Sequence, residues 1–304
     1  MKHSIRTSAV VCAAFLLSLA GAACLAPPLR PVGPGATTPE DRKLTFRRYP
    51  LLTEDGRNLY AWYLPAPKPR AVLVQFHDDG VGMSEAYTSL DWLVGRGFGL
   101  LTFDYRGYGR SEGRASIQNF HRDAATVLKF AHDFAAKNNT KLIVYGQGMG
   151  ALVALRAVPF MKSQKHLNAV VVEGYQPSYA AHARSAYRDR YGCVFPLNLI
   201  PAAFTRSGPP LPAGGAGPGV LKKVPLFVLH GTRDRVASMS GARRLYNSAR
   251  KPRFFLELPA GHDVWRAESS AGSRDLFVKL LETAATDGDF TDFEDKFEPG
   301  DAEY

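Results

Sequence analysis

The chain has 304 residues, of which 45% are hydrophobic and 22% are charged. This balance excludes a disordered or collagen-like chain and allows a buried core in one domain or two. The formal net charge is +10, but the last 18 residues hold eight acidic residues and one lysine, so a basic body precedes an acidic tail. The cysteines, Cys12, Cys24 and Cys193, form no CxxC pair and no Cys/His cluster, so neither a metal site nor a disulfide framework is expected.

The first 26 residues have the layout of a signal peptide. Two basic residues precede an uncharged run rich in Ala, Leu and Val that ends in small residues. Cys24 follows Gly21-Ala22-Ala23, an arrangement similar to a bacterial lipobox, although that pattern prefers leucine where Gly21 stands. A lipid anchor on Cys24, cleavage near Ala22 and an uncleaved anchor all stay open. Each outcome exports the protein to the cell envelope or beyond it, which argues against nucleic acid as a partner.

Residues 27–42 contain five prolines and no apolar periodicity, which predicts a stiff tether. Residues 44–49 and 59–64 flank turn residues and predict an antiparallel strand pair. From there on, apolar strands alternate with amphipathic helices, which predicts an α/β fold with a mostly parallel, doubly wound sheet. The expected strands are 71–77, 98–104, 141–145, 169–173, 225–230 and 254–258, and the expected helices are 84–96, 118–137, 149–160, 240–249 and 264–283.

Four segments follow predicted strands and together resemble the α/β-hydrolase superfamily, in particular its bacterial esterase and serine aminopeptidase-like branch. Residues 104–113 read DYRGYGRSEG, and residues 146–150 read GQGMG at the place of the nucleophile elbow G-x-S-x-G. Residues 230–234 (HGTRD) and 260–263 (AGHD) are similar to the segments that supply the acid and the histidine of the catalytic triad. The resemblance implies one α/β-hydrolase domain over 43–285, with a short lid at about 174–220, followed by an acidic tail over 286–304.

Gly148 stands where this family has its serine. Acyl transfer through an acyl-enzyme needs a side-chain nucleophile, and glycine has none. Glycine also adopts positive φ without strain, so the turn itself is expected to form. The resemblance gives Asp234 and His262 as a retained acid–histidine pair, and the sequence predicts that Gly148→Ser restores ester hydrolysis.

The oxyanion hole, by resemblance, uses backbone N–H groups of Met149 and of the loop at Asp78. The family often reads HGxxG in that loop, whereas this chain reads His77-Asp78-Asp79-Gly80. The two carboxylates would oppose an oxyanion if they pointed inward. We expect them to face solvent or to cap the next helix. His77 and Tyr175 are expected to contact a ligand, and the aromatic and cationic lid suits an amphiphilic or anionic one.

Three functions stay open from the sequence. The first is a catalytically impaired hydrolase-like envelope protein that binds a small or lipid-like ligand or another envelope protein, with no cofactor. The second is an active esterase or peptidase that uses water or another nucleophile with Asp234 and His262. The third is a dinucleotide-binding protein, because Gly146-x-Gly148-x-x-Ala151 follows a strand and precedes Glu173. This last hypothesis leaves the other three segments unexplained.

Overall fold

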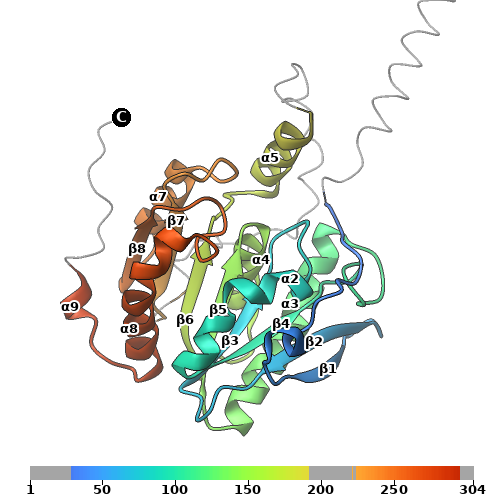
Figure 1. Ribbon diagram of the computed structural model, residues 1–304, viewed down its shortest axis with the longest axis horizontal. Coiled ribbons are helices and arrows are strands. Elements are labelled where there is room, and N and C mark those ends of the chain that lie inside the picture. The colour runs from blue at the N-terminus through green and yellow to red at the C-terminus, as the bar shows by residue number, and fades with distance from the viewer. Residues whose placement is uncertain (1–28, 192–220, 222–223, 295–304) are drawn as a thin grey trace, which may run out of the picture.

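The computed structural model describes residues 29–191, 221 and 224–294, and Figure 1 shows their arrangement. Eight strands form one sheet in the order β1-β2-β4-β3-β5-β6-β7-β8. The pairs β1–β2 and β2–β4 are antiparallel and the other five are parallel, which confirms the predicted α/β fold. The strands are β1 (Arg47–Leu52), β2 (Asn58–Leu64), β3 (Ala71–Phe76), β4 (Phe98–Phe103), β5 (Lys141–Gln147), β6 (Leu167–Glu173), β7 (Leu226–Gly231) and β8 (Arg253–Leu258).

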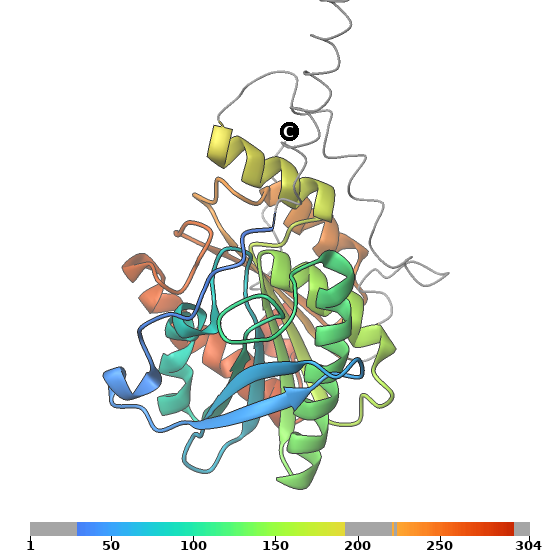
Figure 2. The ribbon, with the colours of Figure 1, turned by 90° about the vertical axis from the view of Figure 1, so that its right-hand side faces the viewer.

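Helices cover both faces of the sheet (Figures 1 and 2). Side chains of α3, α4 and α7 pack on one face, and those of α2 and α8 pack on the other, so each face has its own apolar core. Strands buried on both sides need the continuous apolar runs that the sequence shows. The helices are α2 (Met83–Ala86), α3 (Ile117–Lys137), α4 (Met149–Ala157), α5 (Tyr179–Tyr191), α7 (Met239–Ser248), α8 (Arg274–Ala285) and α9 (Thr291–Glu294). No helix in the described part of the chain is both long and apolar enough to cross a membrane.

Two predicted helices are shorter than the apolar spacing indicated. The helix expected over 84–96 ends at Ala86, and the 3₁₀ turns Tyr87–Ser89 and Asp91–Arg96 replace its remainder. These turns still bury residues three and four apart, so the periodicity alone cannot distinguish them from an α-helix. The helix expected over 264–283 begins only at Arg274, after a 3₁₀ turn over Glu268–Ser273 that is rich in Ser and Gly, which are weaker helix formers than Ala.

The described part of the predicted tether packs along the domain (Figure 2). The Arg30 backbone N–H donates to Asp79 Oδ1 at 2.7 Å, and Gly109 N–H donates to the Val32 carbonyl at 2.8 Å. Farther along, the Thr37 hydroxyl donates to a backbone carbonyl of α2 at 2.9 Å. Residues 29–42 therefore have fixed neighbours on the loops after β3 and β4. The signal segment 1–26 with Cys24, most of the lid and tail residues 295–304 lie outside the described residues.

The DYRGYG segment fixes the loop after β4. Asp104 Oδ1 accepts the Met83 backbone N–H at 2.7 Å, which holds the start of α2. Arg106 forms ion pairs with Asp123 at 2.6 Å and with Asp55 at 2.8 Å. Gly109 has φ of 50°, and a Cβ there would stand 1.8 Å from Asp104 Oδ2, so no side chain fits. This segment supports the loops that surround the candidate site.

Candidate active site

The turn from β5 into α4 has the shape expected of a nucleophile elbow. Gly148 has φ of 55° and directly precedes the first residue of α4. Its N–H donates to the Glu173 carbonyl on the neighbouring strand at 2.8 Å. Gly150 approaches β3 so closely that a Cβ would stand 2.1 Å from the Phe76 carbonyl oxygen. The glycines on both sides of the turn are thus required by close backbone approach, as the motif predicts.

The side chain of Asp78 lies on this turn. Its Oδ1 accepts two backbone N–H groups, that of Met149 at 2.6 Å and that of Asp79 at 2.8 Å. A Cβ built on Gly148 would stand 2.2 Å from Asp78 Cγ, so the carboxylate occupies the space that a side chain at position 148 would need. The expectation that the two aspartates face solvent or cap the next helix is therefore wrong. That helix follows Gly82, and Asp104 rather than either loop aspartate binds its first N–H.

His262 lies between two carboxylates. Its Nδ1 contacts Asp234 Oδ2 at 2.8 Å and its Nε2 contacts Asp78 Oδ2 at 3.1 Å. Asp234 Oδ1 in turn accepts the backbone N–H groups of Val236 at 2.7 Å and Ala237 at 2.9 Å. The structure thus brings Asp234 and His262 together as the sequence suggested, and adds an acidic partner that the sequence analysis had placed elsewhere.

The charges of this cluster stabilise one another. Burial lowers the pKa of His262, but the hydrogen bonds and charges of Asp234 and Asp78 outweigh burial and raise its pKa to about 10. Burial raises the pKa of Asp78 and of Asp234, but contact with His262 brings both below their ordinary value. At neutral pH the cluster therefore holds an imidazolium between two carboxylates, and a protonated imidazole cannot accept a proton as a general base.

A second buried carboxylate, Asp79, ties three segments together beside the site. Its side chain accepts the Tyr108 hydroxyl and contacts His182 Nε2 on α5 at 3.2 Å. It also binds the Arg30 backbone N–H. The loop after β3 is therefore fixed to the DYRGYG segment, to the start of the predicted lid and to the N-terminal segment. Sequence reasoning missed this network, because its members are far apart in the chain.

A third buried carboxylate, Glu173 at the end of β6, holds the loop that carries His262. Glu173 Oε1 accepts the Val264 backbone N–H at 2.6 Å, and Oε2 accepts the Tyr145 hydroxyl. The same hydroxyl accepts the Trp265 indole N–H at 2.9 Å. Burial and the charge of Asp263 raise the pKa of Glu173 to about 8. The loops after β3, β7 and β8, the turn after β5 and the end of β6 thus converge on one site, as parallel strands require.

Comparisons with known proteins agree with this geometry. The model of the family described as serine aminopeptidase, S33, matches residues 67–187. An esterase of Pyrococcus furiosus, Pf2001, superposes with a TM-score of 0.63 at 17% sequence identity, covering 85% of this chain and 99% of that one. An α/β hydrolase from Vibrio vulnificus superposes with a TM-score of 0.60 at 16% identity, covering 80% and 82%. This chain has the α/β-hydrolase fold, and part of it matches the serine aminopeptidase family model.

The chain also has sequence relatives in bacteria and yeasts. The uncharacterized protein YfhR of Salmonella typhi is 26% identical over 272 residues, which cover 82% of this chain and 84% of the relative. The protein bem46 of Schizosaccharomyces pombe is 24% identical over 209 residues, covering 66% and 64%. These identities extend over most of the hydrolase domain but leave the reaction open.

The two residues predicted to contact a ligand have different surroundings. His77 is fully buried, with its ring against Tyr105 and Tyr108 and its Nδ1 at 2.8 Å from the Asp78 carbonyl oxygen. It cannot touch a ligand in this conformation. Tyr175 is only partly buried and packs against the apolar core on the α3 and α4 face, so its contact with a ligand stays a prediction. Both side chains follow strand ends, but strand-end position does not determine which way a side chain points.

The two groups that a dinucleotide site would need are already engaged by other residues. Glu173 is buried and engaged by Tyr145 and Val264, so it cannot bind a ribose hydroxyl. The N–H of Met149, at the start of α4 where a pyrophosphate would bind, already donates to a carboxylate. Additional negative charge is disfavoured there. The glycine pattern is explained by the hydrolase turn instead.

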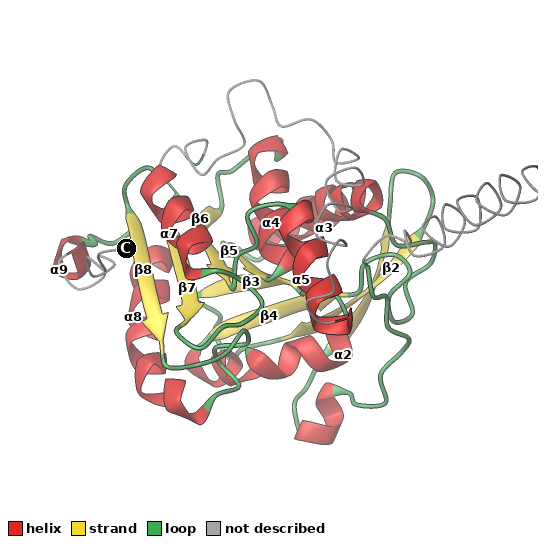
Figure 3. Cartoon of the chain, turned by 90° about the horizontal axis from the view of Figure 1, so that it is seen from above, coloured by secondary structure: helices red, strands yellow, loops and turns green. Residues whose placement is uncertain are grey.

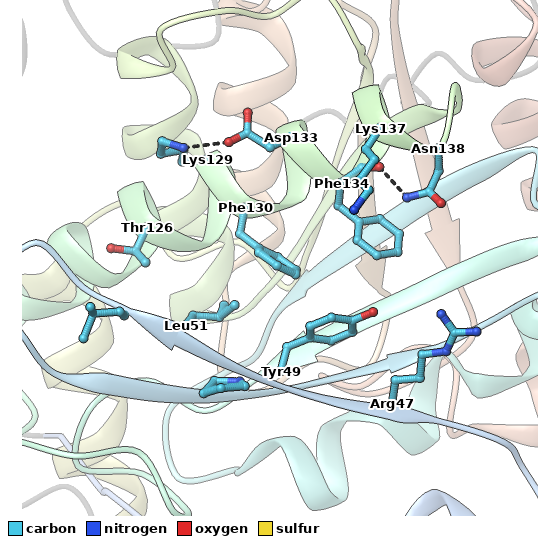
Figure 4. Close-up of a pocket in the computed structure, with 12 residues that line it drawn as sticks. Arg47, Tyr49, Leu51, Thr126, Lys129, Phe130, Asp133, Phe134, Lys137 and Asn138 are labelled. Atoms are coloured by element: carbon cyan, nitrogen blue, oxygen red, sulfur yellow. Dashed lines mark hydrogen bonds and ion pairs between the residues drawn. The ribbon is translucent and has the colours of Figure 1, made fainter.

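A separate hollow of about 580 Å³ lies between β1 and α3 (Figure 4). Tyr49, Phe130 and Phe134 form its apolar part, and cationic side chains including Arg47 and Lys137 line it as well. None of its lining residues belongs to the cluster around Gly148. It is therefore distinct from the candidate active site.

Proposed function

We propose that this protein is an α/β-hydrolase-superfamily member of the cell envelope that has lost serine-type acyl transfer. It acts by holding a small or lipid-like ligand or a protein partner of the envelope. The observation that carries the proposal is the position of the Asp78 carboxylate, which lies over Gly148 and accepts the Met149 N–H. Export, with or without a lipid on Cys24, is part of the proposal and rests on the N-terminal sequence.

Three features support the loss of serine chemistry independently. Gly148 has no attacking atom, and removing the nucleophile of a serine protease costs about 10⁶-fold in rate. The donors that a developing oxyanion would need are occupied by Asp78, and a single such donor is worth about 10² to 10³-fold. His262 is held in its charged form, so it is a poor acceptor for a proton from a serine or from water.

An active esterase that activates water through His262 is the competing function, and the esterase neighbours favour it. It requires a neutral imidazole and an open pair of oxyanion donors. The contacts of Asp78 oppose both requirements at neutral pH. Hydrolysis of this kind would therefore appear only at strongly alkaline pH, where ester hydrolysis by hydroxide is itself faster.

Two measurements on the mature protein test the proposal. A fluorophosphonate probe asks whether an activated serine exists, and p-nitrophenyl esters of two to twelve carbons ask whether turnover occurs. We expect no label and no turnover above the rate of a His262→Ala variant. If the wild-type protein turns over these esters rapidly and His262→Ala abolishes that turnover, the protein is an active hydrolase and the proposal is wrong. If a fluorophosphonate adduct forms and inhibits ester turnover, the proposed loss of serine chemistry is wrong.

A further inference from the structure

The hollow between β1 and α3 is an elongated groove at one edge of the sheet. α3 lies on the opposite side of the sheet from α2 and α8 (Figure 3), and β1 is the last strand of its edge in the described part of the chain. The lining runs from Arg47 to Leu52 on β1 and from Thr126 to Asn138 along α3. At about 3.4 Å per strand residue and 1.5 Å per helix residue, the two walls are about 17 and 18 Å long.

Three partly buried aromatic rings form the middle of this hollow. The ring centroid of Tyr49 lies 5.3 Å from that of Phe130 and 6.1 Å from that of Phe134. The two phenylalanines are four residues apart on α3, so they lie on one face of the helix. Leu52, at the end of β1, is 68% exposed. The hollow therefore presents an apolar wall that neighbouring elements cover only in part.

Two cationic side chains stand at one end of the hollow, where β1 begins and α3 ends (Figure 4). They are Arg47 and Lys137, both exposed, and neither forms an ion pair within the described ranges of the chain. Lys129 also lines the hollow, but it is paired with Asp133 at 2.6 Å, so those two charges compensate each other. The hollow therefore has a positively charged end and an apolar middle.

The backbone at the end of α3 does not cancel this positive charge. Carbonyl groups at a helix C-terminus repel an anion when they have no partner. Here the Phe134 carbonyl accepts the Asn138 backbone N–H at 3.1 Å and the Asn138 side-chain amide at 2.7 Å. The Ala135 carbonyl accepts the Thr140 N–H at 2.9 Å. These bonds leave the two cations to determine the sign of a ligand at this end.

We propose that the hollow binds a free long-chain carboxylate, such as a fatty acid, with its carboxylate on Arg47 and Lys137 and its alkyl chain along the three rings. A guanidinium can bind both oxygens of a carboxylate, and a volume of about 580 Å³ is typical of a small-molecule site. A phosphate ion or an acidic peptide would leave the rings uncovered. The inference goes beyond the proposed function and holds whether or not the cluster at Gly148 hydrolyses esters.

The first test titrates the mature wild-type protein with dodecanoate below its micelle concentration, by isothermal titration calorimetry. We expect the affinity to rise about two- to fourfold per methylene from octanoate to dodecanoate. Dodecyltrimethylammonium, which has the same chain and a cationic head, should bind at least about tenfold more weakly. Arg47→Gln and Lys137→Gln should each weaken dodecanoate binding about tenfold. Arg48→Gln is the matched control, because Arg48 lies on the other face of β1 beside Phe46 and Glu40, and it should leave the affinity unchanged.

The second test locates the bound chain. A dodecanoic acid that carries a diazirine near its terminal methyl should, on photolysis, label the peptides that contain β1 and α3. Excess dodecanoate should suppress this labelling, and Arg47→Gln should reduce it. Labelling confined to the loops around Gly148 would place the fatty acid in the candidate active site and overturn the inference. The fluorophosphonate and ester assays decide the proposed function separately, so the two proposals fail independently.

Three further results would decide against the inference. Equal dodecanoate affinity of Arg47→Gln, Lys137→Gln and the wild type would show that these cations do not bind the carboxylate. Vesicles of phosphatidylglycerol that bind the protein through Arg47, when free dodecanoate does not bind, would make the hollow a membrane-docking surface. A wild-type dimer that Arg47→Gln dissociates, again without dodecanoate binding, would show that a second copy covers the hollow. Because Arg47 is exposed, its substitution is not expected to unfold the protein.

Discussion

The Asp78 carboxylate fills the space that a side chain at position 148 would need. A Cβ on Gly148 would stand within 2.4 Å of Cγ and both carboxylate oxygens of Asp78. The inward direction of the Asp78 carboxylate therefore depends on the missing side chain at position 148. A serine does not fit at position 148 while Asp78 keeps this conformation, so we now expect that Gly148→Ser restores hydrolysis only when Asp78 is changed as well.

The first prediction concerns paired substitution at these two positions. Gly148→Ser alone should be inactive and destabilised, because it adds both the clash and about 1–2 kcal/mol of positive-φ strain. Gly148→Ser with Asp78→Ala should react with fluorophosphonate and hydrolyse p-nitrophenyl esters at least about 10²-fold faster than either single variant, since the oxyanion donors become free. Adding His262→Ala should remove that gain. Equal activity of the single and double serine variants would show that Asp78 does not block the site.

The second prediction follows from the charge of His262. Its pKa is about 10 in the folded protein, above the ordinary value, so the stabilisation from its charged form is complete below about pH 6.5 and is lost as the pH rises toward 10. Asp78→Asn removes one of the two carboxylates and should move the imidazole titration to lower pH. NMR of the His262 ring across pH 5–11 measures both midpoints, with His262→Gln assigning the signal. A wild-type midpoint near 6.5 would contradict the imidazolium between two carboxylates.

The sequence was sufficient for the fold and for one pair of site residues. Strands such as Ala71–Phe76 are buried along their whole length because helices cover both faces of the sheet, and their nearly continuous apolar run is a local signal. Asp234 and His262 follow the last two strands of the sheet, whose carboxyl ends lie side by side. The resemblance to the hydrolase segments indicated this pair, and the neighbouring ends of β7 and β8 bring the two loops together.

The direction of Asp78 could not be derived in the same way. A loop carboxylate faces solvent by default, and only the space left by Gly148, 70 residues farther along the chain, admits Asp78 to the turn. The signal was present as two departures from one family pattern, the lost serine and the aspartates after His77. Treated separately, each had an ordinary explanation. His77 failed as a ligand contact because burial depends on neighbours that local sequence does not specify.

The third prediction concerns Glu173. Burial and Asp263 raise its pKa to about 8. The protonated form therefore contributes stability that is complete below the ordinary glutamate pKa and is lost as the pH rises through about 8. Glu173→Gln keeps an acceptor for the Val264 N–H but cannot ionise, so its free energy of unfolding should fall less between pH 5 and pH 9 than that of the wild type. Urea unfolding at both pH values measures this, with Glu257→Gln as an exposed control. Identical pH dependence would show that Glu173 is already ionised at low pH.

The last prediction concerns Arg106, the ion-pair partner of a fully buried carboxylate. Asp123 has no exposed side-chain surface and contacts Arg106 at 2.6 Å. Arg106→Met leaves that carboxylate without its cation, which should lower the free energy of unfolding by about 3–5 kcal/mol. Arg106→Met with Asp123→Leu removes both charges and should recover much of this loss. Lys129→Met, which breaks an exposed pair with Asp133, is the matched control and should change stability by less than about 1 kcal/mol. If the double variant is no more stable than Arg106→Met, the loss comes from packing of the arginine and not from the unpaired carboxylate.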